Sequence, residues 1–136
     1  MHIMKRFIAL ILVSILMVCA ISSCGAKPAS DPETAKVALE EAGYRVSQSR
    51  SIMDSDEYEG IVEALDVTGS RGVSNISLTI CYFESNEAAS KAWDNPVIQN
   101  YIRVAEEATW IPDTFVAKKV GNIIYYGDKE MVKDAK

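Results

Sequence analysis

Cysteine and histidine carry the most reactive side chains in this 136-residue chain, and both are scarce. The only histidine is His2, and the three cysteines are Cys19, Cys24 and Cys81. A thiol becomes a nucleophile when a base or a positive charge lowers its pKa. Cys81 stands in the middle of an alternating apolar stretch, a poor place for an exposed nucleophile, so we expect a small core residue there.

The N-terminus shows a pattern that bears on Cys24. Lys5 and Arg6 precede an uncharged, apolar run over 7–21, and the run ends in Ile21-Ser22-Ser23-Cys24. As a helix this run would span roughly 22 Å at about 1.5 Å per residue. A bilayer core is about 30 Å thick, so the run has the length of a signal-peptide apolar region rather than of a membrane span.

Residues 1–24 resemble the signal peptide of a bacterial lipoprotein, whose lipobox reads aliphatic, small, small, cysteine. The resemblance implies that residues 1–23 are removed and that Cys24 becomes an N-terminus carrying a thioether-linked diacylglyceryl group. Two acyl chains give stable anchoring, which places the protein on the extracytoplasmic face of the cell membrane. Cys19 fits less well because Val18 precedes it. Two alternatives remain: an uncleaved membrane helix over 4–21, and ordinary cleavage with Cys24 incidental.

Cleavage would change what the rest of the chain can do. Lys5 and Arg6 leave with the signal peptide, so 14 basic residues become 12 against 19 acidic ones, a net charge near −7. Such a chain repels nucleic acid and anionic head groups, so its membrane contact is expected to come from the lipid. Without His2 it has no imidazole for a Ser-His-Asp site or a metal, and Cys81 has no disulfide partner.

The remaining sequence predicts a tether over 24–30 and one α+β domain over 31–136. Helix-start signals occur at Asp31-Pro32, at Ser85 or Asn86, at Asn95-Pro96 and at Asp128. Strands are expected over the ranges 44–52, 60–68, 75–83, 115–120 and 123–126, with turns at 69–72 and 121–122. The expected fold has two layers, a mainly antiparallel sheet with helices on one face, in the order α-β-β-β-α-β-β-α.

The strand over 75–83 has the clearest alternation. One face carries large apolar side chains, and the other is more polar at its start; the two sets are Ile76, Leu78, Ile80 and Tyr82, and Ser77, Thr79, Cys81 and Phe83. This pattern is typical of an antiparallel sheet that is covered by helices on one side.

An acidic loop follows the first expected strand. Asp54, Asp56 and Glu59 offer oxygen ligands of the kind Ca²⁺ prefers. An EF-hand loop that begins at Asp54 would need glycine where Glu59 stands and glutamate where Leu65 stands, so that motif fails. A solvated acidic loop is the favoured interpretation, with no metal or other cofactor, and no spacing supports acid–base chemistry by Asp56 and Glu59.

Aromatic side chains could form a binding surface on the uncovered sheet face. Adjacent residues of a strand point to opposite faces, so Phe83 and either Tyr125 or Tyr126 could share that face. Such a platform would suit a protein or a glycan. The favoured alternative is that these rings complete the core.

These observations favour a lipid-anchored binding or accessory module that contacts an envelope protein or wall polymer. The folded domain is similar in style to small uncharacterised lipoproteins of monoderm bacteria. Alternatives are a carboxylate-based envelope hydrolase and a purely structural or inhibitory lipoprotein. Catalysis is the less favoured class, because no histidine remains and Cys81 is expected in the core.

Overall fold

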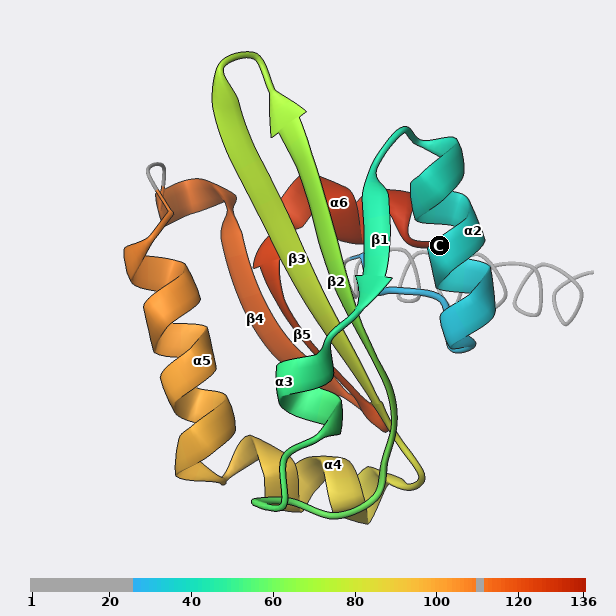
Figure 1. Cartoon of the computed structure of the whole chain (residues 1–136), viewed down its shortest axis with the longest axis vertical. Helices are drawn as coiled ribbons and strands as arrows, with labels where there is room; N and C mark the ends of the chain where they lie inside the picture. Colours follow the sequence, from blue (N-terminus) through green and yellow to red (C-terminus); the bar gives the residue numbers. More distant parts are fainter. Residues whose placement is uncertain (1–25, 110–111) are drawn as a thin grey trace, which may run out of the picture.

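A five-stranded antiparallel sheet organises the described part of the chain, residues 26–109 and 112–136 of the computed structural model (Figure 1). The strands are β1 (Arg45–Gln48), β2 (Ile61–Arg71), β3 (Ser74–Phe83), β4 (Phe115–Val120) and β5 (Ile123–Asp128), in the spatial order β1-β2-β3-β5-β4. The helices are α2 (Pro32–Glu41), α3 (Arg50–Met53), α4 (Asn86–Trp93), α5 (Pro96–Glu107) and α6 (Lys129–Asp134), with a 3-10 turn at Pro112–Thr114. The α+β class, the antiparallel sheet and the order of the main elements are confirmed.

Side-chain caps begin the helices at the positions the sequence indicates. Asp31 accepts a hydrogen bond from the Thr34 amide at 3.0 Å, and Ser85 accepts one from the Ala88 amide at 3.0 Å. Asn95 caps α5 in the same way and so separates it from α4. Each cap satisfies a backbone N–H that the first helical turn leaves without a partner.

The β2–β3 hairpin is longer than the sequence indicated. Its strands stay paired as far as Arg71 and Ser74, so the turn is Gly72-Val73 and not the predicted 69–72 segment. Gly72 has a φ of +63°, a conformation that glycine adopts without strain. The longer hairpin carries Arg71 to its tip.

The first predicted strand is shorter than expected, because its end forms a helix. β1 stops at Gln48, and α3 follows, with Ile52 buried. The Tyr58 hydroxyl donates to the Ile52 carbonyl at 2.7 Å, and the Tyr58 ring meets the Phe83 ring edge-on at 6.2 Å. The side chain of Tyr58 therefore fixes the acidic loop and α3 against the sheet.

Helices cover both faces of the sheet, so the expectation of helices on one face is wrong. α2 and α6 cover the face of Leu78, Ile80 and Tyr82, whereas α3, α4 and α5 cover the face of Cys81 and Phe83. Figure 1 shows these two groups on either side of the sheet. The polar start of the second face misled the prediction, because Cys81 and Phe83 at its other end pack beneath the small side chains Ala89 and Ala92 of α4.

Residues 26–30, predicted to be a tether, pack onto the domain. The Tyr82 hydroxyl donates to the Ala29 carbonyl at 2.7 Å, and the Tyr125 hydroxyl donates to the Ala26 carbonyl at 3.3 Å. The Ala29 amide donates to the Ala135 carbonyl at 2.8 Å, and Pro28 is buried. Residues 26–30 therefore belong to the domain, and Cys24 and Gly25 lie outside the described residues.

Candidate functional site

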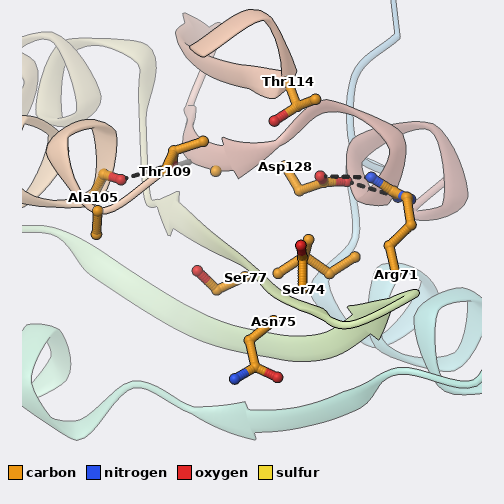
Figure 2. A pocket seen from close by; sticks show the side chains of 11 residues that line it. Arg71, Ser74, Asn75, Ser77, Ala105, Thr109, Thr114 and Asp128 are labelled. Atoms are coloured by element: carbon orange, nitrogen blue, oxygen red, sulfur yellow. Dashed lines mark hydrogen bonds and ion pairs between the residues drawn. The ribbon is translucent and has the colours of Figure 1, made fainter. Parts of the chain in front are cut away.

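A hollow with both apolar and polar lining lies between the tip of the β2–β3 hairpin and the end of α5; we call it the hairpin hollow (Figure 2). Its volume is about 250 Å³. Side chains with hydroxyl, amide and charged groups alternate there with small apolar ones: Arg71, Ser74, Asn75, Ile76, Ser77, Ala105, Ala108, Thr109, Thr114, Gly127 and Asp128. Elements far apart in the sequence thus converge on one site.

An ion pair between Arg71 and Asp128 forms one side of this hollow. The two guanidinium nitrogens lie 2.9 and 3.1 Å from the two carboxylate oxygens, a bidentate geometry. The Asp128 side chain is 4% exposed and that of Arg71 is 43% exposed. The hydrogen bonds that Arg71 donates to Asp128 raise the pKa of Arg71, so the guanidinium keeps its charge.

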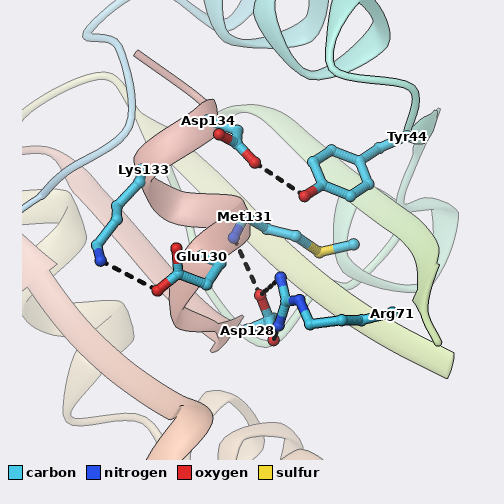
Figure 3. A network of polar contacts seen from close by, with 7 residues as sticks. All are labelled: Tyr44, Arg71, Asp128, Glu130, Met131, Lys133 and Asp134. Carbon is cyan, nitrogen blue, oxygen red and sulfur yellow. Dashed lines mark hydrogen bonds and ion pairs between the residues drawn. The ribbon is translucent and has the colours of Figure 1, made fainter. Parts of the chain in front are cut away.

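Asp128 has a second role at the start of α6. Its Oδ1 accepts from the Met131 amide at 3.0 Å (Figure 3). A carboxylate at a helix N-terminus is also favoured by the helix dipole. Because Arg71 and the helix amide both engage it, this buried carboxylate is a structural anchor rather than a candidate general base.

A second polar contact extends the network toward α2. The Tyr44 hydroxyl donates to Asp134 at 2.8 Å (Figure 3). Burial and, next, the hydrogen bond to Asp134 raise the pKa of Tyr44. Gly69 lies beneath the Tyr44 ring, where a Cβ would come within 2.6 Å of a ring carbon. The absence of a side chain at Gly69 therefore makes room for the contact.

Gly127 lets strand β5 approach β3 closely at the hollow. It has a φ of +140°, and a Cβ built there would lie 2.6 Å from Leu78 Cα and would collide with the Ser77 carbonyl. Glycine is thus required both by conformation and by space.

The lining of the hairpin hollow suits a small group that presents both apolar and polar surface. Ser74, Ser77 and Asn75 are exposed, so their hydroxyl and amide groups can exchange hydrogen bonds with a ligand. The Thr109 hydroxyl donates to the Ala105 carbonyl at 2.9 Å. Pockets for drug-sized molecules occupy about 300–1,000 Å³. The hollow is smaller and fits one sugar unit or one amino-acid side chain.

Cys81 is buried, as the sequence predicts. It is a free thiol with 0% exposure, packed beneath α4 and α5. Burial, with a smaller contribution from Asp66, raises the pKa of the thiol to about 12. The thiol is therefore neutral at physiological pH, and the environment opposes nucleophilic chemistry.

The acidic loop residues do not converge on a single point. Asp54 lies at the end of α3, whereas Asp56 and Glu59 border a second depression, which we call the acidic hollow. Glu57, Glu84 and Glu87 border it as well. Among residues 26–109 and 112–136, no three histidine, cysteine or acidic side chains are grouped so that they could hold a metal ion.

The aromatic residues proposed as an exposed platform lie in the core, so the platform hypothesis is wrong. Phe83 is 1% exposed, Tyr125 1% and Tyr126 6%. Phe83 and Tyr126 pack against α4 and α5, and Tyr125 packs on the opposite face. The rings complete both halves of the core, the alternative that the sequence favoured.

The hairpin hollow was missed by sequence reasoning. Asp128 was recognised as a helix cap and Arg71 as a turn residue, but nothing in the sequence indicates that these two pair across 57 positions. Ser74, Asn75 and Ser77 are polar residues at the start of a strand, a common pattern that does not by itself indicate a binding site. The hollow becomes visible only when β5 is placed beside β3.

Comparisons with protein-family models, curated protein sequences and solved structures find no match for this chain. Within the part of the chain that the structure describes, no helix has the length and apolar character to cross a bilayer. The signal peptide over 1–23 and the lipidation site Cys24 lie outside the described residues. The functional argument therefore depends on the sequence pattern and the geometry alone.

Proposed function

We propose that this protein is a lipid-anchored binding or accessory module of the cell envelope. Cys24 carries the anchor, and the hairpin hollow binds the partner, an envelope protein or a wall polymer. The anchor is supported by the pattern Lys5-Arg6, apolar run, Ile21-Ser22-Ser23-Cys24. We expect this protein to use no cofactor. We also expect its partner not to be a nucleic acid, since the acidic chain repels a phosphate backbone.

The observation that carries the binding role is the make-up of the hairpin hollow. Exposed hydroxyl and amide groups of Ser74, Asn75 and Ser77 surround a small depression. Asp128, which lines the same hollow, is held by Arg71 and by the Met131 amide of α6. The exposed polar groups can bind a ligand, whereas the Asp128 carboxylate is already hydrogen-bonded and is not free to act as a catalytic base. The hollow therefore supports ligand binding more than bond cleavage.

Photo-crosslinking on intact cells tests the binding role. A benzophenone amino acid replaces Asn75 in the hollow, and in a matched control it replaces Gln99, an exposed residue of α5 outside the hollow. We expect one dominant adduct from position 75 and none from position 99. Ala108→Trp, which fills the hollow from the end of α5, should abolish the adduct. Equal labelling from both positions contradicts a site in the hollow.

Cell fractionation tests the anchor. We expect Cys24→Ala to prevent lipidation and to release or mislocalise the protein, with a change in gel mobility. Cys81→Ala is the matched control, because that thiol is buried and should leave fractionation unchanged. A Cys24→Ala chain that stays in the membrane fraction with unchanged mobility would contradict the anchor.

A further inference from the structure

We infer that the hairpin hollow binds the acetamido group of an N-acetylated amino sugar, and that the polysaccharide which carries this sugar continues across strands β3, β2 and β1. The inference rests on the proposed function, because it takes the hairpin hollow to be the binding site. It names the chemical class of the partner: a wall polymer that contains N-acetylated amino sugars and is uncharged over the units that are bound.

The lining of the hairpin hollow matches the two parts of an acetamido group. Apolar surface makes up most of this lining. Aliphatic side chains come from β3 and the end of α5, and hydroxyl and amide groups come from the start of β3: Ile76, Ala105 and Ala108, and Ser74, Asn75 and Ser77. An acetamido group has a methyl group, which gains from leaving water, and an N–H and a C=O, which exchange hydrogen bonds with such polar side chains. The hollow therefore favours an acetamido group over a hydroxyl group.

The charges at the hairpin hollow compensate each other. Arg71 and Asp128 are paired at 2.9 and 3.1 Å, and Asp128 also accepts from the Met131 amide. A charged group on the ligand would compete with one member of this pair, whose carboxylate is only 4% exposed and depends on its cation. The pair therefore favours a neutral group such as acetamido over a carboxylate or an amine.

A second hollow adjoins the first, and we call it the sheet hollow. It is lined by residues 42–45, 68–70 and 75–77, and its volume is about 690 Å³. Residues 75–77 line both hollows, so the two depressions meet at the start of β3. A polymer bound in the hairpin hollow can therefore continue into the sheet hollow.

A row of polar side chains crosses the sheet hollow. Arg45 pairs in register with Thr68, and Thr68 pairs with Ser77, so these three side chains lie on one face of neighbouring strands. Strands are about 4.8 Å apart, so the row spans about 10 Å from Ser77 to Arg45. Ser70 and Asn75 form a shorter row beside it. A linear chain of sugars that lies at right angles to the strands meets a polar side chain at each strand.

The side chains of both rows are exposed and available for binding. Among residues 26–109 and 112–136 they make no hydrogen bond or ion pair. Helices α3 and α4 cover the same face of the sheet further along the strands, at Ala64, Cys81 and Phe83. In Figure 1 the β2–β3 hairpin extends well beyond both helices. The polar groups of the two rows can therefore exchange hydrogen bonds with a ligand.

The charge on this face also suits an uncharged polymer. Arg45 is the only charged side chain among the described residues that line the sheet hollow. Asp66 lies on the same face, two residues before Thr68 in β2, and accepts a hydrogen bond from Thr79 at 3.1 Å. One cation and one carboxylate on neighbouring strands give this surface no strong potential of either sign. Specificity for the polymer then comes from hydrogen bonds and from the acetamido group.

Isothermal titration calorimetry tests the class of ligand. The full lipidated chain, purified from membranes in detergent, is titrated with β-1,4-linked oligomers of N-acetylglucosamine that contain one to four units. Glucose oligomers of the same linkage and lengths are the matched ligands without the acetamido group. We expect the N-acetylglucosamine trimer to bind about ten-fold or more tightly than the glucose trimer. We also expect affinity to rise from one to three units, because the added units reach the row that ends at Arg45.

Two variants separate the contributions of the two hollows. Ala108→Trp fills the hairpin hollow and should remove the preference for the acetamido group. Thr68→Val removes a hydroxyl from the middle of the row, and should weaken trimer binding about five-fold while leaving the binding of a single sugar unchanged. Ser47→Ala is the matched control, because Ser47 is an exposed residue on the same face that lines neither hollow. The melting temperature checks that each variant is folded.

The outcomes distinguish this inference from the proposed function. Equal affinity for the two series of oligomers, or no binding of either series, overturns the assignment of an N-acetylated amino sugar. Affinity that does not increase with length overturns the path across the sheet. If the crosslinker at position 75 then gives one dominant adduct with a protein, the proposed function stands without the polysaccharide. Equal crosslinking from positions 75 and 99 overturns the binding site and this inference together.

Discussion

Arg71 at the tip of the β2–β3 hairpin holds both carboxylate oxygens of Asp128, the residue that precedes α6, at 2.9 and 3.1 Å. The pair joins the far end of the longest hairpin to the last helix of the chain. Because Asp128 also caps α6, one buried carboxylate supports the hairpin, the helix and one side of the hairpin hollow.

Arg71→Met should therefore lower the free energy of unfolding by about 1–2 kcal/mol. The substitution leaves the buried Asp128 carboxylate without its cationic partner, although the half-exposed position of Arg71 limits the loss. Urea unfolding followed by circular dichroism measures it. Arg103→Met, which breaks the exposed pair with Glu107, is the matched control and should cost about 0.5 kcal/mol or less. Equal losses in the two variants would contradict the structural role of the pair.

Gly127→Ala should be among the most destabilising single-methyl additions in the domain. The new Cβ would collide with the Ser77 carbonyl and would lie 2.6 Å from Leu78 Cα, so β5 must move away from β3. We expect a loss of about 3 kcal/mol or more, seen as a lower thermal midpoint. Gly72→Ala is the control: Gly72 also has positive φ, but no atom lies within 4 Å of its added Cβ. We expect Gly72→Ala to lower the free energy of unfolding by about 1–2 kcal/mol. An equally small loss in Gly127→Ala would argue against the close contact between β5 and β3.

Local features of the fold were predictable from the sequence because their causes are local. Asp31, Ser85 and Asn95 each accept a backbone N–H two or three residues ahead, and the Gly121-Asn122 turn joins neighbouring strands. The faces of β3 also follow from alternation alone. These signals identify the elements and the α+β class.

The layering and the hairpin hollow depend on contacts between distant residues. Ser77 and Thr79 make one face of β3 look solvated, yet Cys81 and Phe83 on that face are buried by α4. Residues 26–30 are mostly small and are typical of a linker in sequence, because the hydroxyls that hold them come from the distant residues Tyr82 and Tyr125. Patterns of hydrophobicity contain no information about such partners.

The docked N-terminal segment should be visible in hydrogen exchange. The Ala29 amide donates to the Ala135 carbonyl, so it should exchange more slowly than the amide of exposed Lys27. Tyr82→Phe removes the hydroxyl that binds the Ala29 carbonyl and should increase the Ala29 exchange rate, because the free energy of local opening falls by about 1 kcal/mol. Tyr101→Phe, on α5 and remote from this segment, should leave the rate unchanged. Fast Ala29 exchange in the wild type would show that the segment is not held.

The free energy of unfolding should decline in alkaline solution, and the Cys81 thiol should be the first group to lower it. Burial raises the pKa of this thiol from 9.0 to about 12, so the unfolded chain loses its thiol proton at lower pH than the folded chain. The stabilisation is complete below pH 9 and is lost as the pH rises from 9 toward 12. In a chain with serine at positions 19 and 24, the free energy of unfolding should fall by about 1 kcal/mol per pH unit within that window.

The Cys81→Ala variant distinguishes the contribution of the thiol to the pH dependence of stability from the contribution of the tyrosines. The variant loses packing at every pH, but its unfolding free energy should stay level until the tyrosines begin to ionise. Burial also raises the pKa of Tyr58, Tyr82 and Tyr126 above 10.0, so their stabilisation is lost as the pH rises through that value. Urea midpoints measured at pH 7, 9 and 10 should therefore fall by more in the Cys81 chain than in the variant, in which only the tyrosines contribute to the fall. If the two chains decline in parallel over this range, the Cys81 thiol is not held neutral by the fold.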